Sequence, residues 1–202
     1  MIKKREIDIF GVLLGIVIGC IIGFFLSTRI NINPPNNNND DDTTGAIYGN
    51  VYLLQIGKVN KAEDAYNLIE NIKAQDLHSV YVNVGDNYYV YGGIADSEAA
   101  LAAKKSSFEY KGFTPVIKKE YILDKPNTVI DNSTEYEFWR ECVTNLLNNL
   151  GGKTYVVTDQ FHANPVCLEI YTLIVALKSV QNENMRDEIR LNIYQEIIKN
   201  LN

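Results

Sequence analysis

The chain has 202 residues and a formal net charge of −6, and 46% of its residues are hydrophobic. This length allows one or two small domains with packed cores, and the acidic balance argues against a nucleic-acid-binding protein, which usually presents a basic face. The 3 cysteines and 2 histidines are too few and too scattered for a disulfide framework or a zinc site. We therefore expect no metal site and no cofactor.

The N-terminal part of the chain carries the signal of a membrane protein. Residues 1–8 are a short basic tail, and residues 9–28 contain the stretch IFGVLLGIVIGCIIGFFL, which has no charge and no proline. About 18–20 apolar residues cross the hydrocarbon core of a bilayer. Because basic residues precede this segment, the positive-inside rule predicts a cytoplasmic N-terminus and extracytoplasmic C-terminal domains. We therefore predict a single-pass protein of the cell membrane.

Glycines recur at every fourth position of this segment. At helical spacing they form one stripe, on which the backbone of another helix can approach closely. The stripe favours a homodimer or pairing with another membrane helix, although glycine is also simply common in membrane helices. Its members are Gly11, Gly15, Gly19 and Gly23.

The residues Val17–Cys20 allow a second interpretation of the same segment. Their sequence, VIGC, resembles a lipoprotein processing box, in which Cys20 would be lipidated. The apolar run continues through IIGFFL, however, where a lipoprotein would normally turn polar. A transmembrane helix therefore remains the prediction.

Residues 29–48 differ sharply in composition from the segment before them. They include the stretch NPPNNNNDDDTTG, whose prolines, asparagines and aspartates cannot form an apolar core. Such a stretch is typical of a disordered linker. It would tether the next domain close to the membrane.

Residues 49–122 contain two similar halves. Each half reads as a strand that ends in glycine, a short turn and an alanine-rich helix, as in YLLQIGKVNKAEDA and YYVYGGIADSEAA. We expect a first helix that is capped by Asn60 and a second helix that starts at Asp96 or Ser97. The resulting order, β-α-β-β-α-β, predicts an α+β fold in which both helices cover one face of a four-stranded antiparallel sheet. The predicted strands are 51–56, 79–84, 88–93 and 113–122.

The other face of this sheet is predicted to be open. Alternation along the strands assigns Leu54, Ile56, Val80, Val82, Val84 and Val90 to the helix side. Flat tyrosine rings and amide groups on the open side suit an uncharged polymer of acetamido sugars. Alternatively, these side chains serve cross-strand packing, or the C-terminal region covers them. The predicted open-face residues are Leu53, Gln55, Tyr81, Asn83, Tyr89 and Tyr91.

The two repeated stretches resemble the SPOR (sporulation-related repeat) domain, whose first and third strands have similar tyrosine-to-glycine motifs. The resemblance implies a peptidoglycan-binding module that prefers glycan strands stripped of their stem peptides. Gln55 matches the first-strand glutamine that is associated with glycan binding, and Tyr89 and Tyr91 match outward positions of the third strand. The chain departs from the motif at Gly92, which replaces the usual apolar residue before Gly93.

Residues 131–202 show helical periodicity. Helices are predicted over residues 134–150, from Pro165 to Val180, and from Asn182 to the C-terminus. We expect these three helices to form a small bundle or to lie against the SPOR-like unit. The whole layout resembles that of the stage II sporulation protein B of endospore-forming bacteria.

The sequence contains no recognisable catalytic constellation, phosphate-binding loop or zinc-ligand set. We therefore predict a non-catalytic, membrane-anchored protein that binds denuded peptidoglycan glycan at the division or sporulation septum. The alternative is a scaffold of the cell envelope, in which the sheet face and the helical tail bind protein partners.

Overall fold

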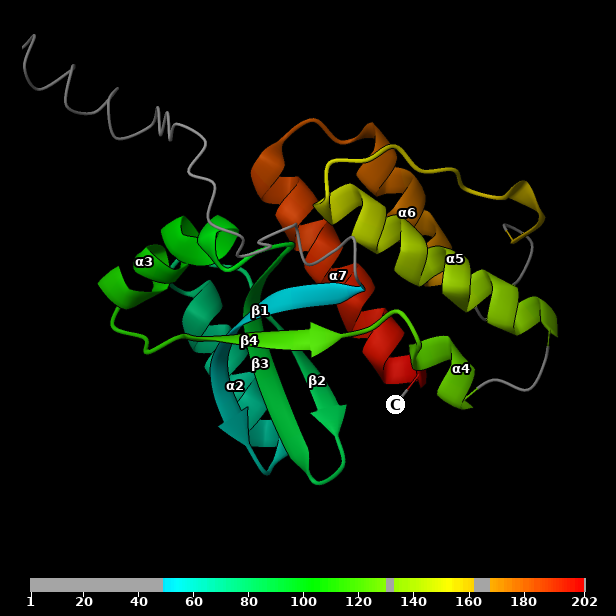
Figure 1. The fold of residues 1–202 in the computed structure, drawn as a ribbon. Coiled ribbons are helices and arrows are strands. Elements are labelled where there is room, and N and C mark those ends of the chain that lie inside the picture. The colour runs from blue at the N-terminus through cyan, green and yellow to red at the C-terminus, as the bar shows by residue number, and fades with distance from the viewer. Residues whose placement is uncertain (1–48, 130–132, 162–167, 202) are drawn as a thin grey trace, which may run out of the picture. The chain divides into compact units, whose positions relative to one another are not determined.

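The computed structural model describes residues 49–129, 133–161 and 168–201 (Figure 1). The predicted tail, transmembrane helix, glycine stripe and linker of residues 1–48 lie outside the described residues. No helix within the described ranges is both long enough and apolar enough to cross a bilayer. The described residues all belong to one compact unit.

The predicted four-stranded antiparallel sheet is confirmed. Its order is β2-β3-β1-β4, so that β2 and β4 are the edge strands. Gly85 has a positive φ of 59° in the two-residue turn between β2 and β3, a backbone conformation that glycine adopts easily. The strands are β1 (Asn50–Val59), β2 (Val80–Val84), β3 (Asn87–Ala95) and β4 (Val116–Tyr121).

Two helices cover the first face of the sheet, as predicted, but both begin later than the sequence suggests. α2 (Ala62–Lys73) has Lys61 and not Asn60 as its N-cap residue, and no side chain caps it. The 3-10 turn η2 (Ala99–Leu101) leads into α3 (Ala102–Tyr110), and Ser97 Oγ accepts a hydrogen bond of 3.4 Å from the Ala100 amide. Leu54, Ala65, Ile72, Val90 and Phe108 form the core of this layer.

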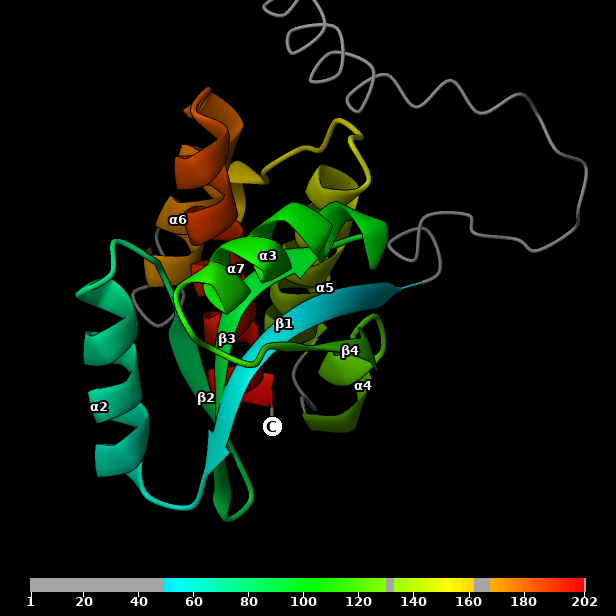
Figure 2. The same cartoon turned by 90° about the vertical axis from the view of Figure 1, so that its left-hand side faces the viewer.

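A second helical layer covers the opposite face (Figures 1 and 2). The three predicted C-terminal helices are present, together with a short helix before them that the sequence analysis did not predict. The layer consists of α4 (Lys125–Val129), α5 (Ser133–Leu150), η3 (Asp159–Phe161), α6 (Leu168–Ser179) and α7 (Glu183–Leu201). α7 packs directly on β2 and β3, and the other helices pack on α7 and on one another, which gives a three-layer α/β/α arrangement.

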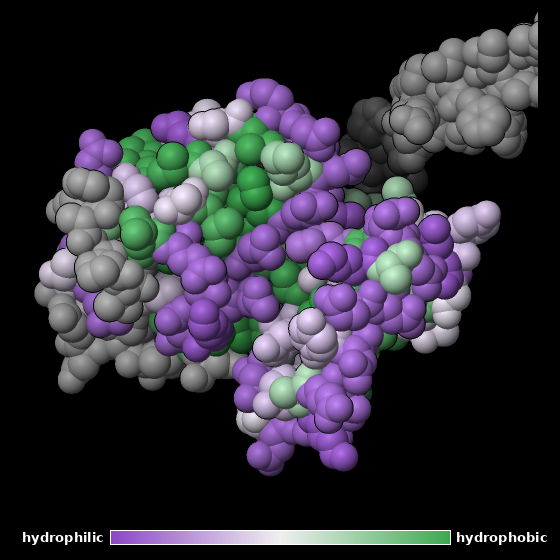
Figure 3. All heavy atoms as spheres, turned by 180° about the vertical axis from the view of Figure 1, so that it is seen from behind, coloured by the Kyte–Doolittle hydropathy of each residue, from purple (hydrophilic) through white to green (hydrophobic). Residues whose placement is uncertain are grey.

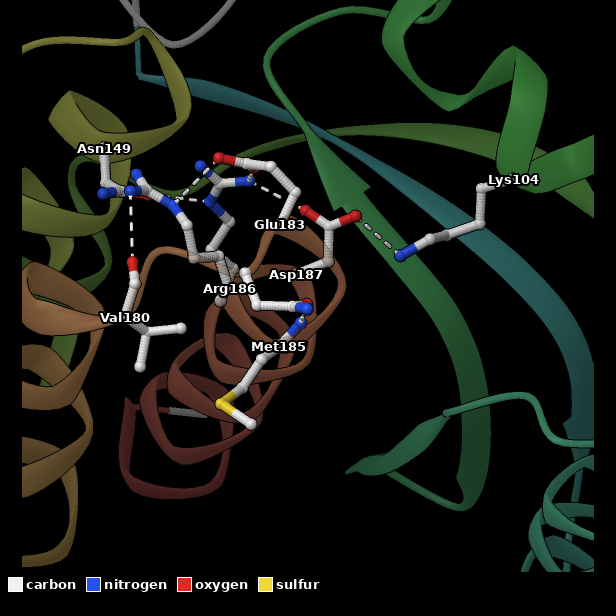
Figure 4. A network of polar contacts seen from close by, with 9 residues as sticks. Lys104, Asn149, Val180, Glu183, Met185, Arg186 and Asp187 are labelled. Carbon is white, nitrogen blue, oxygen red and sulfur yellow. Dashed lines mark hydrogen bonds and ion pairs between the residues drawn. The ribbon is translucent and has the colours of Figure 1, made fainter.

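Polar contacts also join the two parts of the chain (Figure 4). Lys104 Nζ on α3 lies 2.9 Å from an Asp187 oxygen on α7. The other Asp187 oxygen accepts a hydrogen bond of 2.7 Å from Arg190, whose Nε donates to Asn149 on α5 at 2.7 Å. Because Arg190 is largely buried, this charge-assisted chain ties α3, α5 and α7 together.

Gly92 lies at an interruption of the β1–β3 ladder. Leu54 pairs with Gly93 and Gln55 pairs with Tyr91, so Gly92 has no partner on β1. The Phe108 ring occupies the space above it, and a Cβ atom at this position would lie only 2.3 Å from Phe108 Cζ. The close approach of this ring explains why glycine replaces the larger apolar residue of the family motif.

Candidate functional site: a partly covered sheet face

The sheet face that was predicted to be open is largely covered. Val51, Leu53 and Tyr91 belong to one core cluster with residues of the C-terminal helices, among them Trp139 and Tyr194. Leu53 is 1% exposed and Tyr91 is 7% exposed. The predicted exposure of these two side chains is therefore wrong, because the apolar face of the helical layer packs on them.

The predicted orientation of β2 is also wrong. Val80 and Val82 contact the cluster under the C-terminal helices, whereas Tyr81 packs against the cluster of α2 and α3. The cause is the hairpin register, in which Val82 pairs with Tyr89 and Asn83 pairs with Tyr88. Paired residues of an antiparallel ladder share a face, so Asn83 lies on the side of Tyr81, away from Tyr89.

Tyr194 of α7 is buried in the cluster on the covered face. Its ring meets the Tyr91 ring edge-on, with centroids 5.8 Å apart, and its hydroxyl donates a hydrogen bond to the Glu120 carboxylate. Lys125 Nζ lies 3.0 Å from Glu120. Burial is the main cause that raises the pKa of Tyr91 to about 12, and burial also raises the pKa of Tyr194 above its ordinary value. Both rings are thus held neutral inside the fold.

Part of this face remains accessible, and we call it the open strip. It lies at the end of β1, at the start of β4 and on the adjoining part of β3. Register places all of its members on the face of Leu53 and Tyr91, because Gln55 pairs with Val116 and Tyr91 while Lys58 pairs with Tyr89. Val116 is 49% exposed, and the two lysines are exposed. The open strip consists of Gln55, Lys58, Tyr89, Val116 and Lys118.

The geometry of the open strip centres on Tyr89. This half-buried ring is nearly parallel to the Tyr91 ring, with an interplanar angle of 8° and centroids 6.4 Å apart. Lys58 Nζ lies 5.4 Å from the Tyr89 centroid, within the range of a cation–π contact. The half-buried Gln55 side chain belongs to the same face. The strip therefore combines a flat ring, an amide and two ammonium groups.

Gln55 and Tyr89 were correctly predicted from the sequence to lie on this face, but the two lysines were not predicted. Lys58 follows an irregularity in β1 between Gln55 and Gly57, which shifts the alternation of side chains. Lys118 lies on an edge strand, and its pairing with Leu53 assigns it to this face. The alternation of side chains along VIKKEY in β4 is the sequence signal that indicates the face of Lys118.

The open strip places polar and aromatic groups at the surface, and its five residues form no recognisable catalytic arrangement. Its amide and ammonium groups can donate hydrogen bonds, and its aromatic ring offers an apolar plane. Within residues 49–129, 133–161 and 168–201, no group of three or more His, Cys, Asp or Glu residues could hold a metal ion. The arrangement suits a sugar ring that carries an anionic substituent.

Comparisons with known proteins give the same domain as the sequence motifs. Residues 48–119 match the family model of the SPOR domain. The chain is also similar to the solution structure of the peptidoglycan binding domain of the B. subtilis cell wall lytic enzyme CwlC, with 22% identity and a TM-score of 0.33, over 35% of this chain and 90% of that one. No curated protein matches the chain.

Proposed function

We propose that this chain, in which residues 48–119 match the SPOR domain, binds the glycan strands of peptidoglycan. The match to the SPOR family model is the observation that carries the proposal. The open strip supplies the binding surface, and Gln55 lies on it at the position of the family's glycan-associated glutamine. The proposed role is that of a binding protein and not of an enzyme.

The chemistry of the open strip also accounts for a preference for denuded glycan. Removal of a stem peptide by an amidase leaves a free carboxylate on each muramic acid residue. Lys58 and Lys118 are exposed on the strip and can pair with such carboxylates. Tyr89 offers its ring to the sugar plane, and Gln55 can hydrogen-bond to an acetamido group. When the stem peptide is intact, this carboxyl group forms an amide bond with the peptide and carries no charge, so it cannot pair with the lysines.

We also propose a location, which rests on the N-terminal sequence and on the resemblance to the SPOR family. We place the chain in the cell membrane through residues 9–28, with the SPOR domain outside the cytoplasm, at the division or sporulation septum where denuded glycan accumulates. The glycine stripe from Gly11 to Gly23 would support a homodimer or a membrane partner. Fluorescence imaging of a tagged chain in dividing cells tests this placement, and uniform labelling of the envelope would contradict it.

A pull-down with purified sacculi tests the binding itself. The full-length chain in a sugar-free detergent is mixed with sacculi before and after amidase treatment. We expect more protein to bind the treated sacculi, and we expect the Gln55→Ala/Tyr89→Ala variant to lose this gain. Tyr110→Ala serves as the matched control, because Tyr110 is an exposed tyrosine on α3, away from the strip. Absence of wild-type binding to either preparation would overturn the proposal.

A second candidate function, an envelope scaffold that binds a protein partner, is favoured by α6. This helix is apolar on nearly every side, and apolar side chains gather over it in Figure 3. Leu168 is 51% exposed and Val175 is 39% exposed, so part of its apolar surface faces solvent, as at many protein interfaces. Cross-linking in cells with a photoreactive residue at position 175 would identify such a partner.

A further inference from the structure

A groove separates the β2–β3 hairpin from the C-terminal half of α7, away from the open strip. Its volume is about 890 Å³, within the range of small-molecule sites. One wall comes from the SPOR domain and the other from the helical tail. The polar and aromatic side chains that line it are Tyr81, Asn83, Tyr88, Gln195, Glu196 and Lys199.

The floor of the groove is the free edge of the sheet. β2 is an edge strand, and its two-residue hairpin pairs Val84 with Asn87. Alternation of the antiparallel hydrogen bonds then directs the backbone N–H and C=O groups of Tyr81 and Asn83 away from β3. Gln195 Nε2 donates a hydrogen bond of 2.7 Å to the outward Tyr81 carbonyl, which confirms this direction. The backbone amide and carbonyl of Asn83 thus face the groove.

The groove also presents two aromatic rings. Tyr81 and Tyr88 lie with their centroids 6.0 Å apart and their planes inclined by 58°. Each ring offers an apolar face with a polar edge. Beside them stand the exposed Asn83 amide and, on α7, the Glu196 carboxylate.

We propose that this groove is a second saccharide subsite, which recognises an N-acetylated amino sugar; the inference rests on the proposed glycan-binding function. The acetamido group of such a sugar is a secondary amide, so its carbonyl can accept a hydrogen bond from the outward N–H of Asn83. The sugar ring packs on Tyr81 or Tyr88. The helical tail thereby contributes directly to recognition, through Gln195 and Glu196.

An extended peptide that adds to the edge of β2 is the competing occupant. Strand addition needs a row of free backbone groups along the edge. Here the Tyr81 carbonyl already accepts a hydrogen bond from Gln195. α7 also lies beside the short strand, and its Gln195 and Glu196 line the same groove. A single amide group, as on a sugar, needs only the groups of one residue, so the geometry favours the saccharide.

The hairpin register connects the groove with the open strip. Tyr89 pairs with Lys58 on one side and with Val82, a residue of the groove, on the other. Tyr81, Asn83 and Tyr88 lie on the other face of the hairpin from Tyr89, so a glycan strand on the open strip would reach the groove by passing around the hairpin. Two subsites on one strand would raise the affinity of the chain for longer glycans.

Titration with defined oligosaccharides tests the inference. The full-length chain in sugar-free detergent is titrated by calorimetry with chitotriose, which carries acetamido groups, and with cellotriose, which has the same backbone without them. We expect chitotriose to bind at least about tenfold more tightly, because cellotriose leaves the outward N–H of Asn83 unpaired. We expect Asn83→Ala/Tyr88→Leu to lose chitotriose binding, while Tyr110→Ala retains it.

The same samples separate failure of the groove from failure of the proposed function. Unchanged chitotriose binding in the groove variant, or equal binding of cellotriose, would overturn the groove while sacculus binding stands. Binding of a strand-forming peptide in place of chitotriose would overturn it as well. Should Tyr88→Leu disturb the fold, as Trp139 fluorescence would report, Asn83→Pro alone decides, because proline removes the outward N–H of this exposed edge-strand residue without removing a hydrogen bond of the sheet. Loss of sacculus binding in the wild type would refute the proposed function itself.

Discussion

The effect of Leu53→Ala on the free energy of unfolding tests whether the C-terminal helices cover the sheet. Leu53 is 1% exposed and belongs to the cluster of Trp139 and Tyr194. Truncation of a buried leucine removes its transfer free energy and leaves a cavity, at a cost of about 3 kcal/mol. On an open sheet face the same substitution would change the free energy of unfolding by less than about 0.5 kcal/mol.

Urea titration of the full-length chain in detergent gives this free energy. The chain contains 1 tryptophan, Trp139, which is buried in the same cluster, so its emission reports on the covered face. Leu54→Ala is the matched control, because Leu54 is fully buried on the opposite face, against α2 and α3. We expect similar losses for both variants. A large loss for Leu54→Ala with almost none for Leu53→Ala would refute the covered face.

Three further predictions concern the buried tyrosine pair, the bulge and the open strip. The folded state holds Tyr91 neutral with a pKa of about 12 against an ordinary 10.0, so stability should fall as pH rises from 10.0 towards about 12. Tyr91→Phe should flatten this alkaline loss in urea titrations, and an unchanged slope would contradict burial of the ring. Gly92→Ala should lower the thermal midpoint, because its Cβ would meet the Phe108 ring, and Phe108→Leu should recover part of the loss; equal midpoints for Gly92→Ala and wild type would argue against the bulge. The Lys58→Gln/Lys118→Gln variant should bind stripped sacculi more weakly and with less dependence on salt; an unaltered salt dependence would exclude the lysines from the site.

The topology of the SPOR domain could be predicted because local signals specify it. Alternating strands, Gly85 in the hairpin turn and two alanine-rich helix starts define the order of elements. The faces of β1 were assigned correctly up to Gln55, where the first irregularity of the ladder begins. β2 was assigned to the wrong side because both of its faces pack against helices, which removes the contrast between apolar and polar sides.

The cover over the sheet could not be predicted in the same way. The periodicity of α5 shows that this helix buries one side, but it does not identify the surface that this side meets. Leu53 and Tyr91 therefore looked like exposed binding residues, although both belong to a cluster with residues of the C-terminal helices, among them Trp139 and Tyr194. Gln55 and Tyr89 on the same face remain half-buried.

Hydrogen exchange with and without denuded glycan tests the central claim most directly, which is that the strip binds glycan while the helices remain on the sheet. Backbone amides at 55–58 and 116–118 should gain protection when amidase-treated glycan is added. Protection of α7 and of the strand around Leu53 should stay the same or increase. Faster exchange in α7 on glycan addition, or no added protection on the strip, would contradict the account.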